Sequence, residues 1–184
     1  MKKELLKQRI IKESLEWVKV FTGAIVFALL ITRFVFFTAV VDGQSMEPTL
    51  YNGDRFIVWK LGYEPERGDI VILDPPQGYA DDKKHWVKRV IATEGETVKI
   101  DYSTNSIYVD GCRLDEDYLG ESMAEMSNTT EVTIPDDCVF VLGDNRNHSK
   151  DSRIVGPIRT DSILGKAVLR FWPFAAISTF GGYK

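Results

Sequence analysis

Three short clusters of residues carry the side chains that could do chemistry in this chain of 184 residues. The first cluster, residues 43–50, places Ser45 shortly after a glycine and before a proline. Irregular backbone of this kind exposes a hydroxyl and leaves nearby N–H groups free, although most such serines are simply turn residues. The cluster therefore supplies a candidate nucleophile whose role depends on a partner elsewhere.

The second cluster, residues 85–91, has the alternating pattern of a strand and contains a candidate base. Because side chains alternate between the two faces of a strand, Trp86, Lys88 and Val90 share one face. If that face is buried, desolvation disfavours the ammonium and lowers the pKa of Lys88. Work as a base near neutral pH needs a fall of about three units, roughly 4 kcal/mol. A snorkelling surface lysine is the commoner fate of such a residue.

The third cluster is a polar loop, residues 143–153, which follows an apolar strand expected over residues 138–142. Eleven polar or small residues in a row usually form a solvated loop. Here both signs of charge alternate with hydroxyls, and that composition can also build a hydrogen-bonded platform behind an active site.

Two kinds of serine chemistry fit these clusters. A Ser-His-Asp triad would take His148 or His85 as its base, but neither lies in a nucleophile-elbow context and the chain has no G-x-S-x-G motif. A Ser-Lys dyad needs only a hydroxyl, a neutral amine and backbone donors for the oxyanion. The two histidines lack a third ligand at a sensible spacing, so we expect neither a metal nor another cofactor.

Most of the chain is expected to form short strands that position these clusters. The predicted strands cover residues 55–60, 69–73, 86–93, 96–102, 106–109, 131–134, 138–142 and 163–171. Turn signals separate them, and Asp110-Gly111 marks a plausible hairpin. The sequence therefore predicts a mainly β fold with a mostly antiparallel sheet.

The N-terminal segment has the length and charge pattern of a membrane span. Residues 20–41 carry one charge, Arg33, and 22 residues suffice to cross about 30 Å of hydrocarbon. Six basic residues precede the run, which places the N-terminus in the cytoplasm. The aromatic and β-branched stretch 34–41 favours a strand at the exit. A cleavable signal peptide is the alternative, but Ala39-Val40-Val41 is a poor small-x-small site, and length and basic flank disfavour a buried core helix.

Composition excludes several classes of protein. Ten Phe, seven Tyr and four Trp supply too much apolar area for a disordered chain, and the net charge of −4 does not suit a nucleic-acid binder. Residues 1–41 are basic and the remainder is acidic, as expected for a basic arm at an anionic membrane and an acidic soluble body. Cys112 and Cys138 could form a disulfide or remain inert thiols.

The three clusters, taken in order behind a membrane span, resemble the bacterial type I signal peptidases (leader peptidases) of the short single-span kind typical of Gram-positive bacteria. Each motif is weak alone, but the ordered set is highly specific and covers nearly the whole chain. The matching segments are Ser45-Met46-x-Pro48-Thr49-Leu50, Lys88-Arg89-Val90, and Gly143-Asp144-Asn145-Arg146 with Ser149-x-Asp151-Ser152-Arg153.

The resemblance implies a membrane-anchored serine endopeptidase that removes signal peptides from exported preproteins after small residues of the Ala-x-Ala type. By motif position, Ser45 would be the nucleophile, Lys88 the general base and Ser149 the residue that bonds and orients the lysine amine. Supporting ion pairs are implied as well, namely Asp151 with Arg153 and Asp144 with Arg89. Gly43 stands where many Gram-negative relatives carry an oxyanion-stabilising hydroxyl, so the Ser45 N–H and another group would serve here.

The resemblance also implies a β-rich core with a smaller inserted β region and a pocket for small side chains. The expected divisions are a cytoplasmic tail 1–18, an anchor 19–38, a core 39–96 and 138–184, and a variable insertion 97–137. The −1 and −3 side chains of an extended peptide point the same way and would enter neighbouring pockets. Candidate lining residues are Val41, Met46, Leu50, Phe56, Trp86 and Val87.

The implied setting is the cell membrane, with a single span, a cytoplasmic N-terminus and an extracytoplasmic catalytic domain. The expected partners are signal peptides, membrane lipid and, through functional coupling, the secretion machinery, with no nucleic acid. Two other functions stay open: an inactive peptide-binding membrane module, and a Ser-Lys autoprotease like those of stress-response repressors. The complete dyad argues against the first, and the membrane span with no DNA-binding helix pair argues against the second.

Overall fold

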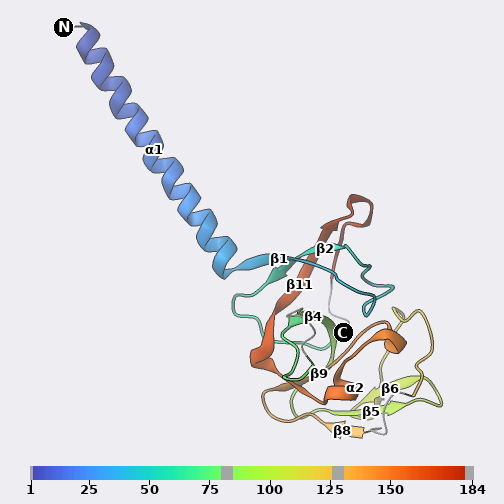
Figure 1. The fold of residues 1–184 in the computed structure, drawn as a ribbon. Helices are drawn as coiled ribbons and strands as arrows, with labels where there is room; N and C mark the ends of the chain where they lie inside the picture. The colour runs from blue at the N-terminus through green and yellow to red at the C-terminus, as the bar shows by residue number, and fades with distance from the viewer. Residues whose placement is uncertain (1, 80–84, 126–130, 181–184) are drawn as a thin grey trace.

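The structure is a computed structural model that describes residues 2–79, 85–125 and 131–180. A long N-terminal helix, α1 (Lys2–Phe34), projects from a domain built mainly of strands (Figure 1). Within the described residues, one helical stretch, Ile11–Phe34, is long and apolar enough to cross a membrane. Its 24 residues correspond to about 36 Å at the rise of an α-helix, which exceeds the hydrocarbon core.

The helix ends earlier than the anchor expected over residues 19–38. It stops at Phe34, and β1 (Phe36–Val40) begins two residues later, so residues 36–38 belong to the sheet. Phe and β-branched residues fit a pleated, half-buried surface, and β1 pairs along its whole length with β2 (Arg55–Trp59). The strand predicted directly after the apolar helix is therefore confirmed. At the other end, α1 includes most of the residues expected as a separate tail.

A large antiparallel sheet forms the body of the domain. Its order is β1-β2-β11-β3-β4-β9-β10, with β12 paired to β11, and every described pairing is antiparallel. The mainly β, antiparallel fold expected from the sequence is thus confirmed. The remaining strands of this sheet are β3 (Ile70–Leu73), β4 (Trp86–Ala92), β9 (Cys138–Leu142), β10 (Ile158–Arg159), β11 (Ile163–Trp172) and β12 (Ser178–Thr179).

A second sheet of four strands lies within the region expected as an insertion. Its order is β7-β6-β5-β8, and it lies at the far end of the domain from α1 (Figure 1). Asp110 and Gly111 both have positive φ, of 50° and 76°, which is the backbone of a tight hairpin turn and confirms the predicted hairpin. These strands are β5 (Thr97–Asp101), β6 (Ser106–Val109), β7 (Cys112–Arg113) and β8 (Glu131–Thr133).

Short helices connect the strands near the third polar cluster and near the C-terminus. They are η1 (Arg146–His148), α2 (Ser152–Val155), η2 (Thr160–Ser162) and η3 (Phe174–Ala176). Asp151 caps α2 by accepting a hydrogen bond from the Arg153 N–H. The third cluster therefore folds into two short turns of helix.

The hydrophobic core has separate clusters on the faces of the large sheet. One cluster lies beneath the Ser45 turn and includes Met46, Leu50 and Phe56. Another joins the large sheet to the second sheet through Phe140 and Leu142. β4, which carries Lys88 and Arg89, also contributes Ile91 and Ala92 to the second of these clusters, so these two site residues lie on a packed strand.

Both cysteines are free thiols in the structure. Cys112 is exposed and Cys138 is half-buried. The disulfide that the sequence left open is therefore not formed, and the stability of the second sheet comes from its pairing and its apolar contacts.

Gly165 is expected to be the most sensitive glycine of the large sheet. A Cβ there would collide with the backbone carbonyl of Trp59 and lie 2.8 Å from Val58 Cγ1, so Gly165→Ala would push β11 away from β2. We expect a loss of about 3 kcal/mol in unfolding free energy, from overpacking and backbone displacement.

Gly95 provides the matched control, because a Cβ there meets nothing within 4 Å and only its φ of +78° opposes alanine. Gly95→Ala should cost about 1 kcal/mol. Denaturant titration of the detergent-solubilised chain measures both values, and equal losses would contradict the close-packing argument.

Candidate active site

Ser45 and Lys88, which are 43 positions apart in the sequence, meet at the centre of the domain. Lys88 Nζ donates a hydrogen bond to Ser45 Oγ at 2.9 Å and another to the Val87 carbonyl at 3.0 Å. Lys88 lies within β4 and is 4% exposed, and Ser45 lies in the turn that follows β1. The hydroxyl and the amine are thus in the contact that a nucleophile and its base require.

Hydrogen bonds on both sides hold the Ser45 turn in place. Below it, the Val41 N–H donates to the Asp54 carbonyl at 2.8 Å and the Gly53 N–H donates to the Val41 carbonyl at 2.9 Å, which extends the β1–β2 hairpin. Above it, the Asn145 N–H donates to the Ser45 carbonyl at 3.0 Å. The turn is therefore tied both to the sheet and to the polar cluster that follows β9.

Burial controls the charge of the Lys88 amine. Desolvation lowers the pKa of Lys88 from 10.5 to about 8, with a smaller lowering effect from Arg153, while Asp151 and Asp144 act in the opposite direction. The amine also lies 5.5 Å from the centre of the Trp86 ring, which forms an apolar wall beside it. With this pKa about a tenth of the molecules carry the neutral amine at pH 7.

The two ion pairs implied for the polar cluster are formed. Arg153 Nε lies 2.8 Å from Asp151 Oδ1, and Arg89 Nη2 lies 2.6 Å from Asp144 Oδ2. All four side chains are almost fully buried. Such pairs stabilise a structure only when their remaining donors and acceptors are satisfied.

The two carboxylates of these pairs also hold the backbone around the dyad. Asp151 accepts a hydrogen bond from the Gly143 N–H at 3.1 Å, and Asp144 accepts one from Thr49 Oγ1 at 2.5 Å. Because Thr49 belongs to the Ser45 turn and Arg89 follows Lys88, Asp144 joins the strand of Lys88 to the turn of Ser45. The polar cluster is therefore a buried platform, as one of the two sequence readings proposed.

Ser149 does not make the contact expected of it. Among the residues that the structure describes, no hydrogen bond joins Ser149 to Lys88. The Ser149 hydroxyl instead makes a weak 3.5 Å bond to the Lys150 carbonyl, whereas the amine is directed to Ser45 and to the Val87 carbonyl. Ser149 is nevertheless buried. It lies close to the Ser45 turn, because a Cβ built on Gly143 would collide with both the Ser149 hydroxyl and the Ser45 carbonyl oxygen.

Gly143 and Arg146 carry structural roles that the sequence did not assign. A Cβ on Gly143 would lie only 2.5 Å from the Ser45 carbonyl oxygen, so this position admits no side chain. Arg146 is fully buried, and its Nε donates to the Gly143 carbonyl at 3.1 Å. Both residues belong to the motif that follows β9, and their place in that motif was the signal that could have identified them.

A cleft with a volume of about 580 Å³ opens beside the dyad. Four of the predicted pocket residues line it, namely Val41, Met46, Trp86 and Val87, together with residues that include Ala39, Ile72, His85, His148 and Lys150. Leu50 and Phe56, the other two predicted pocket residues, do not line this cleft. Both are 0% exposed in the core cluster beneath the turn, because Phe56 faces inward from β2 and Leu50 closes the turn.

One wall of the cleft is the edge strand of the large sheet. β1 stands first in the strand order and pairs with β2 alone among the described strands, and residues 37–41 line the cleft. An unpaired strand edge presents backbone donors and acceptors to which an extended peptide can add. The arrangement thus places an unpaired strand edge beside the Ser45 hydroxyl and the Lys88 amine.

Comparison with known proteins agrees with this arrangement. The profile of the family described as "Signal peptidase, peptidase S26" matches residues 14–172. The chain is 39% identical to the probable signal peptidase I-1 of Synechocystis, over 94% of this chain and 88% of that protein. It is 34% identical to signal peptidase IB of Staphylococcus aureus, over 89% of this chain and 92% of that protein.

Among solved structures, a signal peptidase I from Enterococcus faecalis is 31% identical, with a TM-score of 0.47 over 56% of this chain and 97% of that chain. The family profile covers most of the sequence, including all three polar clusters, and the curated relatives match nearly end to end. The chain therefore belongs to the signal peptidase family, peptidase S26.

Proposed function

We propose that this chain cleaves signal peptides from exported preproteins with Ser45 as the nucleophile and Lys88 as the general base. Its family makes it a serine endopeptidase that removes signal peptides. The observation that carries the assignment of residues is the 2.9 Å contact between Lys88 Nζ and Ser45 Oγ, made by an amine that burial drives toward its neutral form. A neutral amine beside a hydroxyl is a sufficient activating pair for acyl transfer.

The reaction proceeds in two steps, acylation of Ser45 and hydrolysis of the acyl-enzyme. The neutral Lys88 amine accepts the Ser45 proton while Oγ bonds to the carbonyl carbon of the scissile peptide. The resulting ammonium then gives its proton to the leaving amine, the C–N bond breaks, and the signal peptide remains as an ester on Ser45. In the second step the amine takes a proton from a water molecule whose oxygen bonds to the ester carbonyl carbon. The C–Oγ bond then breaks, the ammonium returns the proton to Ser45 Oγ, and the signal peptide leaves with a free carboxyl terminus.

Backbone donors near Ser45 supply the oxyanion contact in this proposal. Within the described part of the chain, the Ser45 N–H donates to no protein acceptor, so it is available to a developing negative charge. Gly43, which has a φ of +106°, offers no hydroxyl two positions earlier. In other enzymes one donor is worth 10²–10³ in rate, so a second donor supplied on substrate binding is part of the proposal.

The walls of the cleft account for a preference for small side chains. The bulky residues Met46, Trp86 and Val87 reduce the space beside the dyad. A peptide added to the free edge of β1 would direct its −1 and −3 side chains to the same face, toward these walls. Ala-x-Ala sites fit such walls, whereas large side chains at either position would collide with them.

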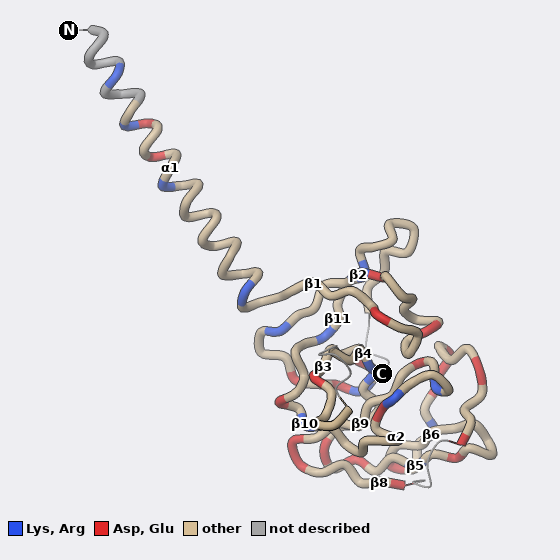
Figure 2. The backbone as a smooth tube through the Cα atoms, in the orientation of Figure 1, with Lys and Arg blue, Asp and Glu red and all other residues tan. Residues whose placement is uncertain are grey.

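The position of the dyad also fits a substrate at the membrane surface. Ser45 follows the end of α1 at Phe34 by only 11 residues, five of them in β1. We place the N-terminus in the cytoplasm, because basic residues precede the apolar part of the helix, and the catalytic domain outside (Figure 2). This placement brings the domain into contact with lipid, and functional coupling to the secretion machinery is a further part of the proposal.

Removal of either dyad member should abolish cleavage. Ser45→Ala removes the attacking oxygen and Lys88→Ala removes the proton acceptor, and we expect each to lower kcat at least 10³-fold. The measurement is cleavage of a preprotein with an Ala-x-Ala site in lipid or detergent. Ser103→Ala and Lys99→Ala, on the second sheet, are matched controls that should retain wild-type rates. Near-normal activity in either dyad variant would refute the assignment.

The rate should rise with pH as Lys88 loses its proton. Since burial lowers the pKa of Lys88 to about 8, kcat/KM should increase about tenfold per pH unit below 8 and level off above it. His85 and His148 line the same cleft, so His85→Gln and His148→Gln test whether an imidazole is responsible. The rising limb should persist in both variants, and its loss in either would assign the base to that histidine.

A further inference from the structure

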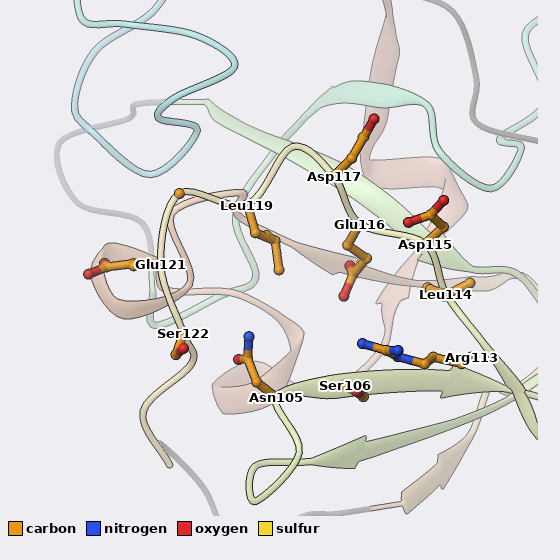
Figure 3. A pocket seen from close by; sticks show the side chains of 11 residues that line it. Asn105, Ser106, Arg113, Leu114, Asp115, Glu116, Asp117, Leu119, Glu121 and Ser122 are labelled. Atoms are coloured by element: carbon orange, nitrogen blue, oxygen red, sulfur yellow. The ribbon is translucent and has the colours of Figure 1, made fainter.

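The segment 114–125, which leaves the second sheet after β7, reaches back to the platform behind the dyad. It lies within the region that the sequence suggested was a variable insertion. Near the end of the segment, the Met123 N–H donates to Asn105 Oδ1, in the turn between β5 and β6, at 2.6 Å. The next residue reaches the platform, because the Ala124 N–H donates to Asn147 Oδ1 at 2.8 Å. The segment borders a hollow of about 540 Å³ on the side of the second sheet (Figure 3).

Glu116 makes the principal contact between this segment and the platform. Its carboxylate receives Arg146 Nη2 at 2.5 Å and Arg146 Nη1 at 3.3 Å, a forked ion pair between side chains that are 7% and 0% exposed. In Figure 3 the Glu116 side chain leaves the segment in a different direction from that of its neighbour Asp117. A buried guanidinium without such a counter-ion would be strongly unfavourable, so Glu116 fixes where Arg146 can lie.

Arg146 in turn fixes the backbone that touches the nucleophile. Its Nε donates to the Gly143 carbonyl at 3.1 Å, and its own carbonyl accepts a bond from Arg153 Nη2 at 2.5 Å. Gly143 lies against the Ser45 carbonyl, to which the Asn145 N–H also donates. A continuous set of contacts therefore leads from Glu116 to the turn that carries the Ser45 hydroxyl.

Tyr118 adds a second contact on the side of the base. Its hydroxyl donates to Glu116 Oε1 at 2.7 Å, and its ring lies 4.0 Å from the Arg89 guanidinium carbon. Arg89 follows Lys88 on β4 and pairs with Asp144, which accepts the Thr49 hydroxyl. Burial raises the pKa of the Tyr118 phenol, so the hydroxyl keeps the proton that it donates.

Among the residues that the structure describes, three buried ion pairs stand behind the dyad, and the pair with Glu116 is the one that the inserted segment completes. Neither Glu116 nor Tyr118 lines the substrate cleft. We propose that Glu116 and Tyr118 are positioning residues for the peptidase reaction. From outside the cleft, they hold the Ser45 turn and β4 in the relative position that brings the hydroxyl to the amine. This inference rests on the proposed function of the dyad.

The proposal predicts a loss of turnover without a loss of substrate binding. Glu116→Gln removes the counter-charge of Arg146 and should lower kcat about 10- to 100-fold with little change in KM, since small misplacement of reacting groups has effects of that size. Glu116→Asp keeps the charge and should recover part of the loss. Tyr118→Phe keeps the ring over Arg89 but removes the bond to Glu116, and should lower kcat about threefold.

Asp117→Asn is the matched control. Asp117 directly follows Glu116 and is exposed, so this variant loses the same charge without disturbing a buried ion pair. A second measurement, the rate constant for acylation of Ser45 by an excess of a serine-reactive probe, is independent of the folded fraction. It should fall in parallel with kcat in Glu116→Gln and stay at the wild-type value in Asp117→Asn.

The outcomes separate this inference from the assignment of the dyad. If Ser45→Ala cleaves normally, the proposed function fails. If the wild-type dyad is confirmed but Glu116→Gln acylates and turns over like Asp117→Asn, or loses only thermal stability, the positioning role is overturned. If Glu116→Gln does not fold, Tyr118→Phe decides, and an unchanged acylation constant in that variant would overturn the role.

Discussion

The structure depends on one contact between an amine removed from water and a hydroxyl. Lys88 Nζ lies 2.9 Å from Ser45 Oγ, and the energetic cost of burying an ammonium is what lowers the pKa of Lys88 to about 8. The amine has to be dry to act as a base, and it stays dry only while the Trp86 wall and the Ser45 turn remain packed around it. In the proposed mechanism, the basicity of the Lys88 amine therefore depends directly on the packing around it.

The polar platform imposes an opposing constraint. Asp144 and Asp151 hold the turn and the loop through backbone and hydroxyl contacts, yet their charges also raise the pKa of Lys88. Arginine partners reduce this conflict, because each buried carboxylate is neutralised by a guanidinium within 3 Å. The loop can therefore use carboxylates as rigid acceptors while the amine remains close to its neutral form.

Sequence reasoning found what local patterns determine and missed what distant contacts determine. Alternation and turn residues placed the strands and the helix-to-strand change, and the ordered motifs placed Ser45 and Lys88 together. Ser149 and Phe56 were assigned from motif order or residue type, which says nothing about where a hydroxyl points or which face of a strand is inward. The Glu116–Arg146 pair joins residues 30 positions apart, so no local sequence pattern marked it.

In the proposed membrane placement, the continuity of α1 and β1 relates the bilayer to the position of the dyad. A helix that passes directly into a paired strand leaves little freedom between the bilayer surface and the cleft, since β1 is hydrogen-bonded to β2 over its whole length. The same strand forms the free edge beside the dyad and leads into the Ser45 turn. A flexible linker at this point would let the domain move relative to the bilayer, whereas a paired strand holds the hydroxyl at a nearly fixed height. In that placement the short path from Phe34 to Ser45 acts as a spacer that sets the distance of the proposed dyad from the lipid surface.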